Sequence, residues 1–113
     1  MRRAKTVCLL IGLITAPAFG RYDGVEAKVR IDAKVICAPR WANDFSMQAT
    51  CVEVMIDGWR SYQRISQEFS GNRPMERALL NCIDRWTEDG RTDFSMAGTC
   101  ARMQKEGWER LNK

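Results

Sequence analysis

Cys82-Ile-Asp-Arg-Trp86 begins a motif that continues with Asp93-Phe-Ser-Met-Ala-Gly-Thr-Cys100 and ends with Gly107-Trp108. An earlier copy reads Cys37-Ala-Pro-Arg-Trp41, then Asp44-Phe-Ser-Met-Gln-Ala-Thr-Cys51, then Gly58-Trp59. Eleven residues are identical between the copies, which stay in register except for the connection after the first tryptophan. Repetition of this kind indicates that one structural unit is built twice.

The apolar residues around each copy recur at the three- and four-residue steps of a helix. Residues 45 to 69 are expected to form the longest helix, which stops at Ser70-Gly71-Asn72 because glycine accepts a left-handed backbone. Residues 25 to 36 also fit the alternation of a strand, but the equivalent residues 75–81 are helical in pattern and favour a helix. The sequence therefore predicts an all-α fold. It contains two tandem helical hairpins, about four helices, with approximate two-fold symmetry between the hairpins.

The predicted helices have recognisable beginnings. Pro74 suits a first turn, because its missing amide hydrogen is not needed there. Side-chain oxygens that can accept hydrogen bonds from free amides precede or begin three of the helices. These candidate caps are Asp44 or Ser46, Ser70 or Asn72, and Asp93 or Ser95.

Four cysteines belong to the motif, and a fifth, Cys8, lies near the start of the chain. In each unit one cysteine precedes the tryptophan by a helical turn, and the other lies about two turns into the next helix. Antiparallel helices with a short connection bring such positions face to face. We therefore expect the disulfides Cys37–Cys51 and Cys82–Cys100, the only pairing that keeps each unit self-contained.

The first twenty residues resemble a secretory signal peptide. Arg2, Arg3 and Lys5 precede an apolar run from Val7 to Ile14, and small residues follow up to Gly20. The run is far shorter than the roughly 20 residues that a membrane-spanning helix needs, so no permanent membrane anchor is expected. The prediction is an exported protein, periplasmic or secreted, with a signal at residues 1–20 and one domain at residues 21–113. That domain contains repeats at about 25–69 and 73–113.

The basic character of the chain belongs mainly to this segment. The whole sequence has 18 basic and 14 acidic residues, for a net charge of +4. Without the three basic residues of the signal, 15 basic residues face 14 acidic ones. A nucleic-acid partner is therefore not expected.

Tryptophans and arginines are the candidate binding residues. The two interpretations of the aromatic residues are core filling and a paired recognition surface. Neighbouring arginines at helical spacing could form small anion-binding sites. The candidates for a binding surface are Trp41, Trp59, Trp86, Trp108, Arg60 and Arg64.

The remaining apolar rows are expected to be core. In the second unit, the expected row is Met96, Cys100, Met103, Gly107 and Leu111. Met47, Met55 and Met75 are also assigned to the core rather than to a copper site. Gly58 and Gly107 are expected to permit close helix approach or to accommodate a neighbouring ring.

The sequence offers little support for catalysis or for metal binding. The chain has no histidine, which excludes a Ser-His-Asp or Cys-His arrangement. It also has no Cys-x-x-Cys pair, which argues against a zinc site. Glu88 and Asp89 lie in a loop, where the sequence offers no neighbour that would adapt them to acid–base catalysis. We therefore expect no catalytic residues, no metal, no cofactor and no enzymatic activity.

The Cys-x-x-x-Trp and Asp-Phe-Ser-Met-x-x-x-Cys spacing is similar to a helical module of small exported bacterial proteins of unassigned function. The resemblance covers residues 37–59 and 82–108 and implies an envelope protein without a stated activity. The leading hypothesis is a non-catalytic module that binds another envelope or secreted protein. The alternatives are a binder of anionic envelope polymers or small anions through arginines, and a hydrolase that uses carboxylates.

Overall fold

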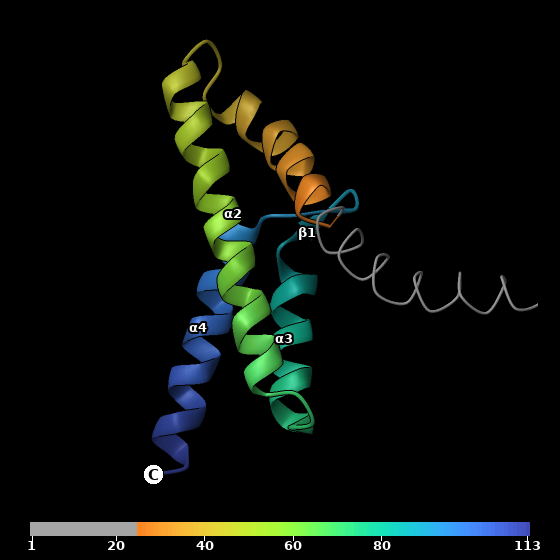
Figure 1. Cartoon of the computed structure of the whole chain (residues 1–113), viewed down its shortest axis with the longest axis vertical. Helices are drawn as coiled ribbons and strands as arrows, with labels where there is room; N and C mark the ends of the chain where they lie inside the picture. Colours follow the sequence, from red (N-terminus) through yellow and green to blue (C-terminus); the bar gives the residue numbers. More distant parts are fainter. Residues whose placement is uncertain (1–24) are drawn as a thin grey trace, which may run out of the picture.

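The computed structural model describes residues 25–113, which form four helices and one short β-hairpin (Figure 1). The first helix covers residues 25–40. It is followed by α2 (Phe45–Glu68), α3 (Arg73–Arg85), β1 (Thr87–Glu88), β2 (Arg91–Thr92) and α4 (Phe94–Leu111). The predicted all-α fold is confirmed, and residues 25–36 are helical. The predicted signal at residues 1–20 lies outside the described residues.

Two disulfides divide this part of the chain into two helical hairpins. Cys37 bonds to Cys51, with 5.9 Å between their Cα atoms, and Cys82 bonds to Cys100, with 5.7 Å. Both predicted bonds are confirmed. Because each bond closes a short loop, it removes unfolded-chain entropy worth about 3 kcal/mol.

Side-chain caps begin three of the helices. Asp44 accepts a hydrogen bond from the Met47 amide at 3.0 Å, and Asn72 accepts one from the Met75 amide at 3.1 Å. Asp93 accepts from the amides of both Ser95 and Met96. The aspartates and Asn72 act as caps, as the sequence allowed, because the alternative Ser46 and Ser95 already lie inside the first turn.

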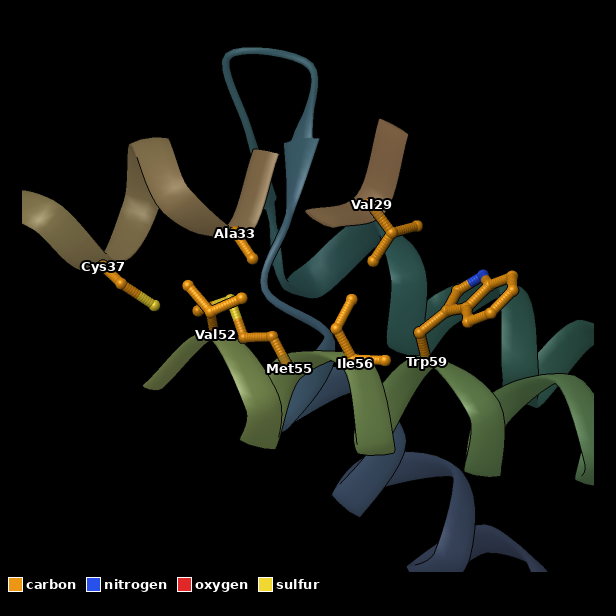
Figure 2. Packing of buried hydrophobic residues seen from close by; sticks show 7 residues of the cluster. All are labelled: Val29, Ala33, Cys37, Val52, Met55, Ile56 and Trp59. Carbon is orange, nitrogen blue, oxygen red and sulfur yellow. The ribbon is translucent and has the colours of Figure 1, made fainter. Parts of the chain in front are cut away.

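The first core cluster joins the first helix to α2 (Figure 2). Val29, Ala33 and Cys37 are spaced four residues apart, so they lie on one face of the first helix and point towards α2. The α2 side of the cluster consists of Val52, Met55, Ile56 and Trp59. This buried face explains why the segment that also fits a strand pattern is a helix.

The second core cluster joins α2, α3 and α4. Its buried residues are Tyr62, Ile65, Met75, Leu79, Cys82 and Ala101. The hydroxyl of Tyr62 donates to the backbone carbonyl of Leu79 at 2.9 Å. Burial, with a smaller contribution from the charge of Asp84, raises the pKa of Tyr62.

The two hairpins meet where α2 crosses the start of α4. A Cβ atom on Gly58 would lie 2.7 Å from the carbonyl carbon of Phe94, and one on Gly98 would lie 2.5 Å from the carbonyl oxygen of Gly58. Both distances are shorter than real Cβ contacts. The prediction of close approach is therefore correct for Gly58. It is wrong for Gly107, where an added Cβ atom would meet nothing within 4 Å.

The relation between the hairpins is a displacement, not the expected two-fold rotation. Gly58 lies against the first turn of α4, and further along both helices Glu68 pairs with Lys105 at 2.9 Å. The two helices consequently run in the same direction (Figure 1). Two-fold symmetry would require Gly107 to be as closely packed as Gly58, its equivalent in the sequence, and it is open.

The connection after Trp86, for which the sequence predicts a loop, is a two-stranded ribbon. Thr87 pairs with Thr92, and Glu88 pairs with Arg91. The two turn residues, Asp89 and Gly90, both have positive φ, 54° and 74°. This is the backbone of a tight hairpin turn, for which Asp-Gly is a preferred sequence.

Candidate functional site

The four tryptophans do not form one surface. Trp59 is only 1% exposed and belongs to the first core cluster, so its assignment to a binding surface is wrong. Trp108 is half-buried against the second cluster. Trp86 is half-buried at the end of α3, and Trp41 is partly exposed after the first helix. The core interpretation therefore holds for Trp59.

The two arginines singled out in the sequence have separate local partners. Arg60 pairs with Glu26 of the first helix at 3.1 Å. Arg64 donates to the Ser61 hydroxyl at 3.3 Å. Arg64 also lines a groove between α2 and α4 whose other charged residues have both signs. The structure does not bring these arginines together into an anion-binding site.

The expected core row of α4 is instead a largely exposed apolar stripe. We call Met96, Met103, Gly107 and Leu111 the α4 stripe, since their spacing places them on one face of the helix. Met103 is 63% exposed and Leu111 is 85% exposed. At one end of the stripe is a groove of about 140 Å³, lined by Trp86, Met96, Cys100 and Met103 among others. The prediction that Met96 and Met103 are core is wrong, whereas Met55 and Met75 are buried as expected.

Small residues explain why α4 turns this stripe outwards. The buried face of α4 consists of Ala97, Gly98 and Ala101. Only small side chains allow the backbone of α4 to approach Gly58 as closely as it does. A row containing methionine and leucine cannot occupy that contact, so the larger residues face away from α2.

A second exposed apolar feature lies on the first hairpin. We call it the Phe45 groove, a hollow of about 310 Å³. Its lining residues are Arg30, Lys34, Cys37, Phe45, Gln48, Ala49, Val52 and Glu53. Phe45 is 77% exposed, although its sequence equivalent, Phe94, packs edge-to-face on Tyr62 with 6.2 Å between ring centroids.

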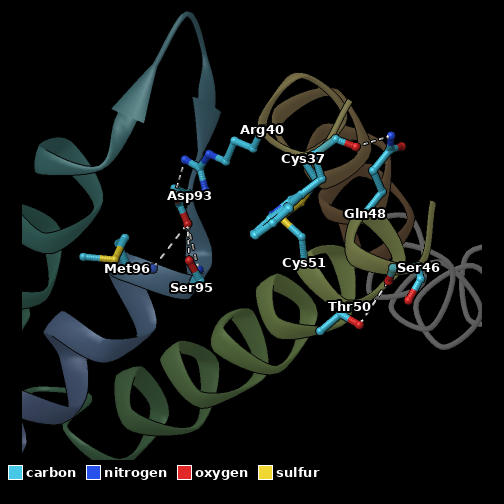
Figure 3. Close-up of a disulfide and its surroundings, with 10 residues drawn as sticks. Cys37, Arg40, Ser46, Gln48, Thr50, Cys51, Asp93, Ser95 and Met96 are labelled. Carbon is cyan, nitrogen blue, oxygen red and sulfur yellow. Dashed lines mark hydrogen bonds and ion pairs between the residues drawn. A yellow bond between two sulfur atoms is a disulfide. The ribbon is translucent and has the colours of Figure 1, made fainter. Parts of the chain in front are cut away.

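A larger cleft of about 670 Å³ separates the end of the first helix from the β-hairpin. Its charged residues are Arg40, Arg85 and Arg91 together with Glu88, Asp89 and Asp93, so its formal charges cancel. Arg40 and Asp93 form an ion pair of 2.8 Å across the two hairpins (Figure 3). Arg91 lies 3.9 Å from Asp32. The cleft therefore offers an anion little net attraction.

Asp93 has the most strongly defined environment of the charged groups in this cleft. Its burial alone would raise the pKa of the carboxyl. Hydrogen bonds from the Ser95 hydroxyl, Arg40 and the Met96 amide, together with the charge of Arg40, more than offset that effect and lower the pKa. Asp93 thus caps α4 and ties it to the first helix, which is a structural role.

Residues 25–113 contain no group of three or more cysteine, aspartate or glutamate side chains placed to hold a metal ion. The four cysteines described are all in disulfides. No helix in the same range is long and apolar enough to cross a membrane. Disulfides of this kind are typical of an oxidising compartment.

Comparison with protein-family models, with curated proteins and with solved structures found no match to this chain.

Proposed function

We propose that the chain is an exported, non-catalytic interaction module whose partner binds the apolar surface of the second hairpin. The observation that carries the proposal is the α4 stripe, where Met103 and Leu111 are more than half exposed. Exposed apolar residues that share one face of an element are typical of binding sites, because single scattered ones are common and gathered ones are not. Methionine suits such a surface because its flexible thioether adapts to the partner.

The export part of the proposal rests on the signal-like residues 1–20 and on the two disulfides. A domain of this size gains much from covalent staples. The staples form and persist only outside the reducing cytosol in most organisms. Removal of residues 1–20 on export would leave the helical domain as the working part.

The arginine-based alternative has less support. Arg60 and Arg64 have separate partners, and the cleft that contains three arginines contains three acids as well. The hydrolase alternative has even less support. Asp44 and Asp93, the acids shared by the two repeats, have structural roles as helix caps.

A photo-crosslinking amino acid placed at Met103 tests the proposal in intact cells. Leu80 of α3 is the matched control, because it is also exposed and apolar but lies outside the stripe. We expect a discrete protein adduct from position 103, lost when Leu111→Glu is added, and no such adduct from position 80. Equal labelling from both positions, or none from position 103, would count against the proposal.

A further inference from the structure

The contact between the two hairpins pairs a knob on one with a seat on the other. The knob is the first turn of α4, where Phe94 and Gly98 lie against α2. The seat is the middle of α2, where Gly58 admits the α4 backbone and Tyr62 meets the Phe94 ring. Because the motif occurs twice in the sequence, each hairpin has its own version of both the knob and the seat.

The unused knob is the first turn of α2, where Phe45 borders the Phe45 groove. Aligning Cys37 with Cys82 and Cys51 with Cys100 relates its lining residues Phe45, Ala49 and Val52 to Phe94, Gly98 and Ala101. The latter three pack against α2 in the fold. Phe45 is 77% exposed and Ala49 is exposed beside it, whereas Val52 is buried in the first core cluster. The first hairpin therefore presents to solvent most of the face that the second hairpin uses for docking.

The unused seat lies on the α4 stripe. The same alignment relates Gly107 to Gly58 and Leu111 to Tyr62. Gly107 has open space where a Cβ atom would be, and Leu111 is 85% exposed. A second backbone could approach Gly107 as the start of α4 approaches Gly58.

Within one chain, the free knob and the free seat belong to opposite ends of the fold. Phe45 is the first residue of α2, and Gly107 lies in the last two turns of α4. The two helices run in the same direction (Figure 1). We infer that the partner of the α4 stripe is a second copy of this chain, whose first turn of α2, with Phe45, docks on Gly107 and Leu111. This inference rests on the proposed function, since it names the partner of the same surface.

The two free surfaces also differ in charge from the pair that meets within the chain. Arg30 and Lys34 line the Phe45 groove and are positively charged. Their equivalents in the second hairpin are the buried, apolar Met75 and Leu79. In the docked arrangement these cations face the last turn of α4, where helix carbonyls without intrahelical partners carry partial negative charge and Arg110 carries a positive one. The end of a helix would thus meet positive side chains, whereas the middle of α2 meets apolar ones.

The geometry makes the association head-to-tail. The second hairpin is displaced along the first, not rotated about a two-fold axis, so a repeat of the same displacement leaves one knob and one seat free at the ends. Contacts of this type do not close after two copies and extend into longer assemblies.

Sedimentation of the oxidised protein, purified from the export compartment of the cells that make it, tests this inference. We expect the average mass to rise beyond that of a dimer as concentration increases. Phe45→Glu and Gly107→Gln should each yield a monomer. An equimolar mixture of the two variants should yield dimers only, because it restores one knob and one seat.

The two variants should leave the monomer folded. Phe45 is exposed and begins a helix, where a carboxylate is favourable. Gly107 has room for a side chain. Leu80→Glu, an equally drastic change on α3, is the control and should assemble like the original protein.

Several outcomes would overturn the inference: a protein that stays monomeric at millimolar concentration and low salt, a mass that stops at a dimer, or variants that still assemble. A mixture of the two variants that remained monomeric would overturn it as well. A monomeric protein that still gave a Met103 adduct with a different protein would reject self-association while keeping the proposed function. Loss of the Met103 adduct together with a monomeric state would reject both.

Discussion

Gly58 of α2 lies against the backbone of Phe94 at the start of α4, so closely that a Cβ atom would come within 2.7 Å of the Phe94 carbonyl carbon. This contact joins the two disulfide-bonded hairpins into one domain. Backbone atoms, unlike the end of a flexible side chain, cannot move aside locally. Any side chain at position 58 must push the two helices apart.

The first prediction is therefore that Gly58→Ala destabilises the protein, although alanine normally stabilises a helix. We expect the free energy of unfolding to fall by roughly 3 kcal/mol, at the upper end of the range for overpacked positions. Unfolding by guanidinium, followed by circular dichroism under oxidising conditions, measures it.

Gly107→Ala is the matched control, because Gly107 has the same place in its Gly-Trp pair but nothing within 4 Å of an added Cβ atom. It should gain up to about 1 kcal/mol from helix propensity. Similar effects of the two substitutions would contradict the close contact at Gly58.

The second prediction concerns the covalent staples. Replacing both Cys37 and Cys51 by serine, or both Cys82 and Cys100, should lower the free energy of unfolding by about 3 kcal/mol in each case. The pairs are changed together so that no thiol is left to form a wrong bond. Peptide mass mapping of the original protein should find each bond inside its own hairpin, and a bond between hairpins would contradict the structure.

Much of this fold could be predicted because its determinants are local. The disulfide pairing follows from two cysteines at fixed distances from one helical connection. The capping roles of Asp44 and Asp93 follow from their position just before a helical row. Such features need no knowledge of what packs against the helix.

The orientation of α4 could not be predicted in this way, because it depends on a distant residue. The row with Met96 and Met103 is the more hydrophobic one, so periodicity assigns it to the core. Gly58 demands small neighbours, and the row of Ala97 and Ala101 faces inwards instead. The sequence does contain one indication of this orientation, the small residue Gly98. It can be interpreted only when Gly58 is known to lie opposite it.

The third prediction concerns the buried hydroxyl of Tyr62. Tyr62→Phe keeps the ring but leaves the Leu79 carbonyl without its 2.9 Å hydrogen bond, which should cost about 1–2 kcal/mol.

Because burial raises the pKa of Tyr62, its ionised form is disfavoured in the folded state. The contribution of the neutral hydroxyl is complete below pH 10.0, its ordinary pKa, and is lost as pH rises through the higher folded value. The stability difference between the original protein and Tyr62→Phe should therefore shrink in alkali. A difference that did not change with pH would contradict this assignment.

The fourth prediction uses Asp93, which caps α4 and binds Arg40 across the two hairpins. Asp93→Asn retains a good capping side chain, so it removes mainly the charge. We expect a loss of about 1–2 kcal/mol at pH 7, typical of hydrogen bonds to a charged group. The pKa of Asp93 is lowered on folding, so its carboxylate contributes fully above its ordinary pKa of 3.8. That contribution disappears as pH falls through the lower folded value.

Urea unfolding of both proteins between pH 2 and pH 7 measures this difference. Asp44→Asn is the matched control, because Asp44 is the equivalent cap of α2 but is exposed. Its substitution should change stability little at pH 7. If the gap between the original protein and Asp93→Asn stayed constant down to pH 2, the link between Arg40 and Asp93 would not be the source of the stability. The contact at Gly58 and the second core cluster would then account for more of the stability of the contact between the hairpins.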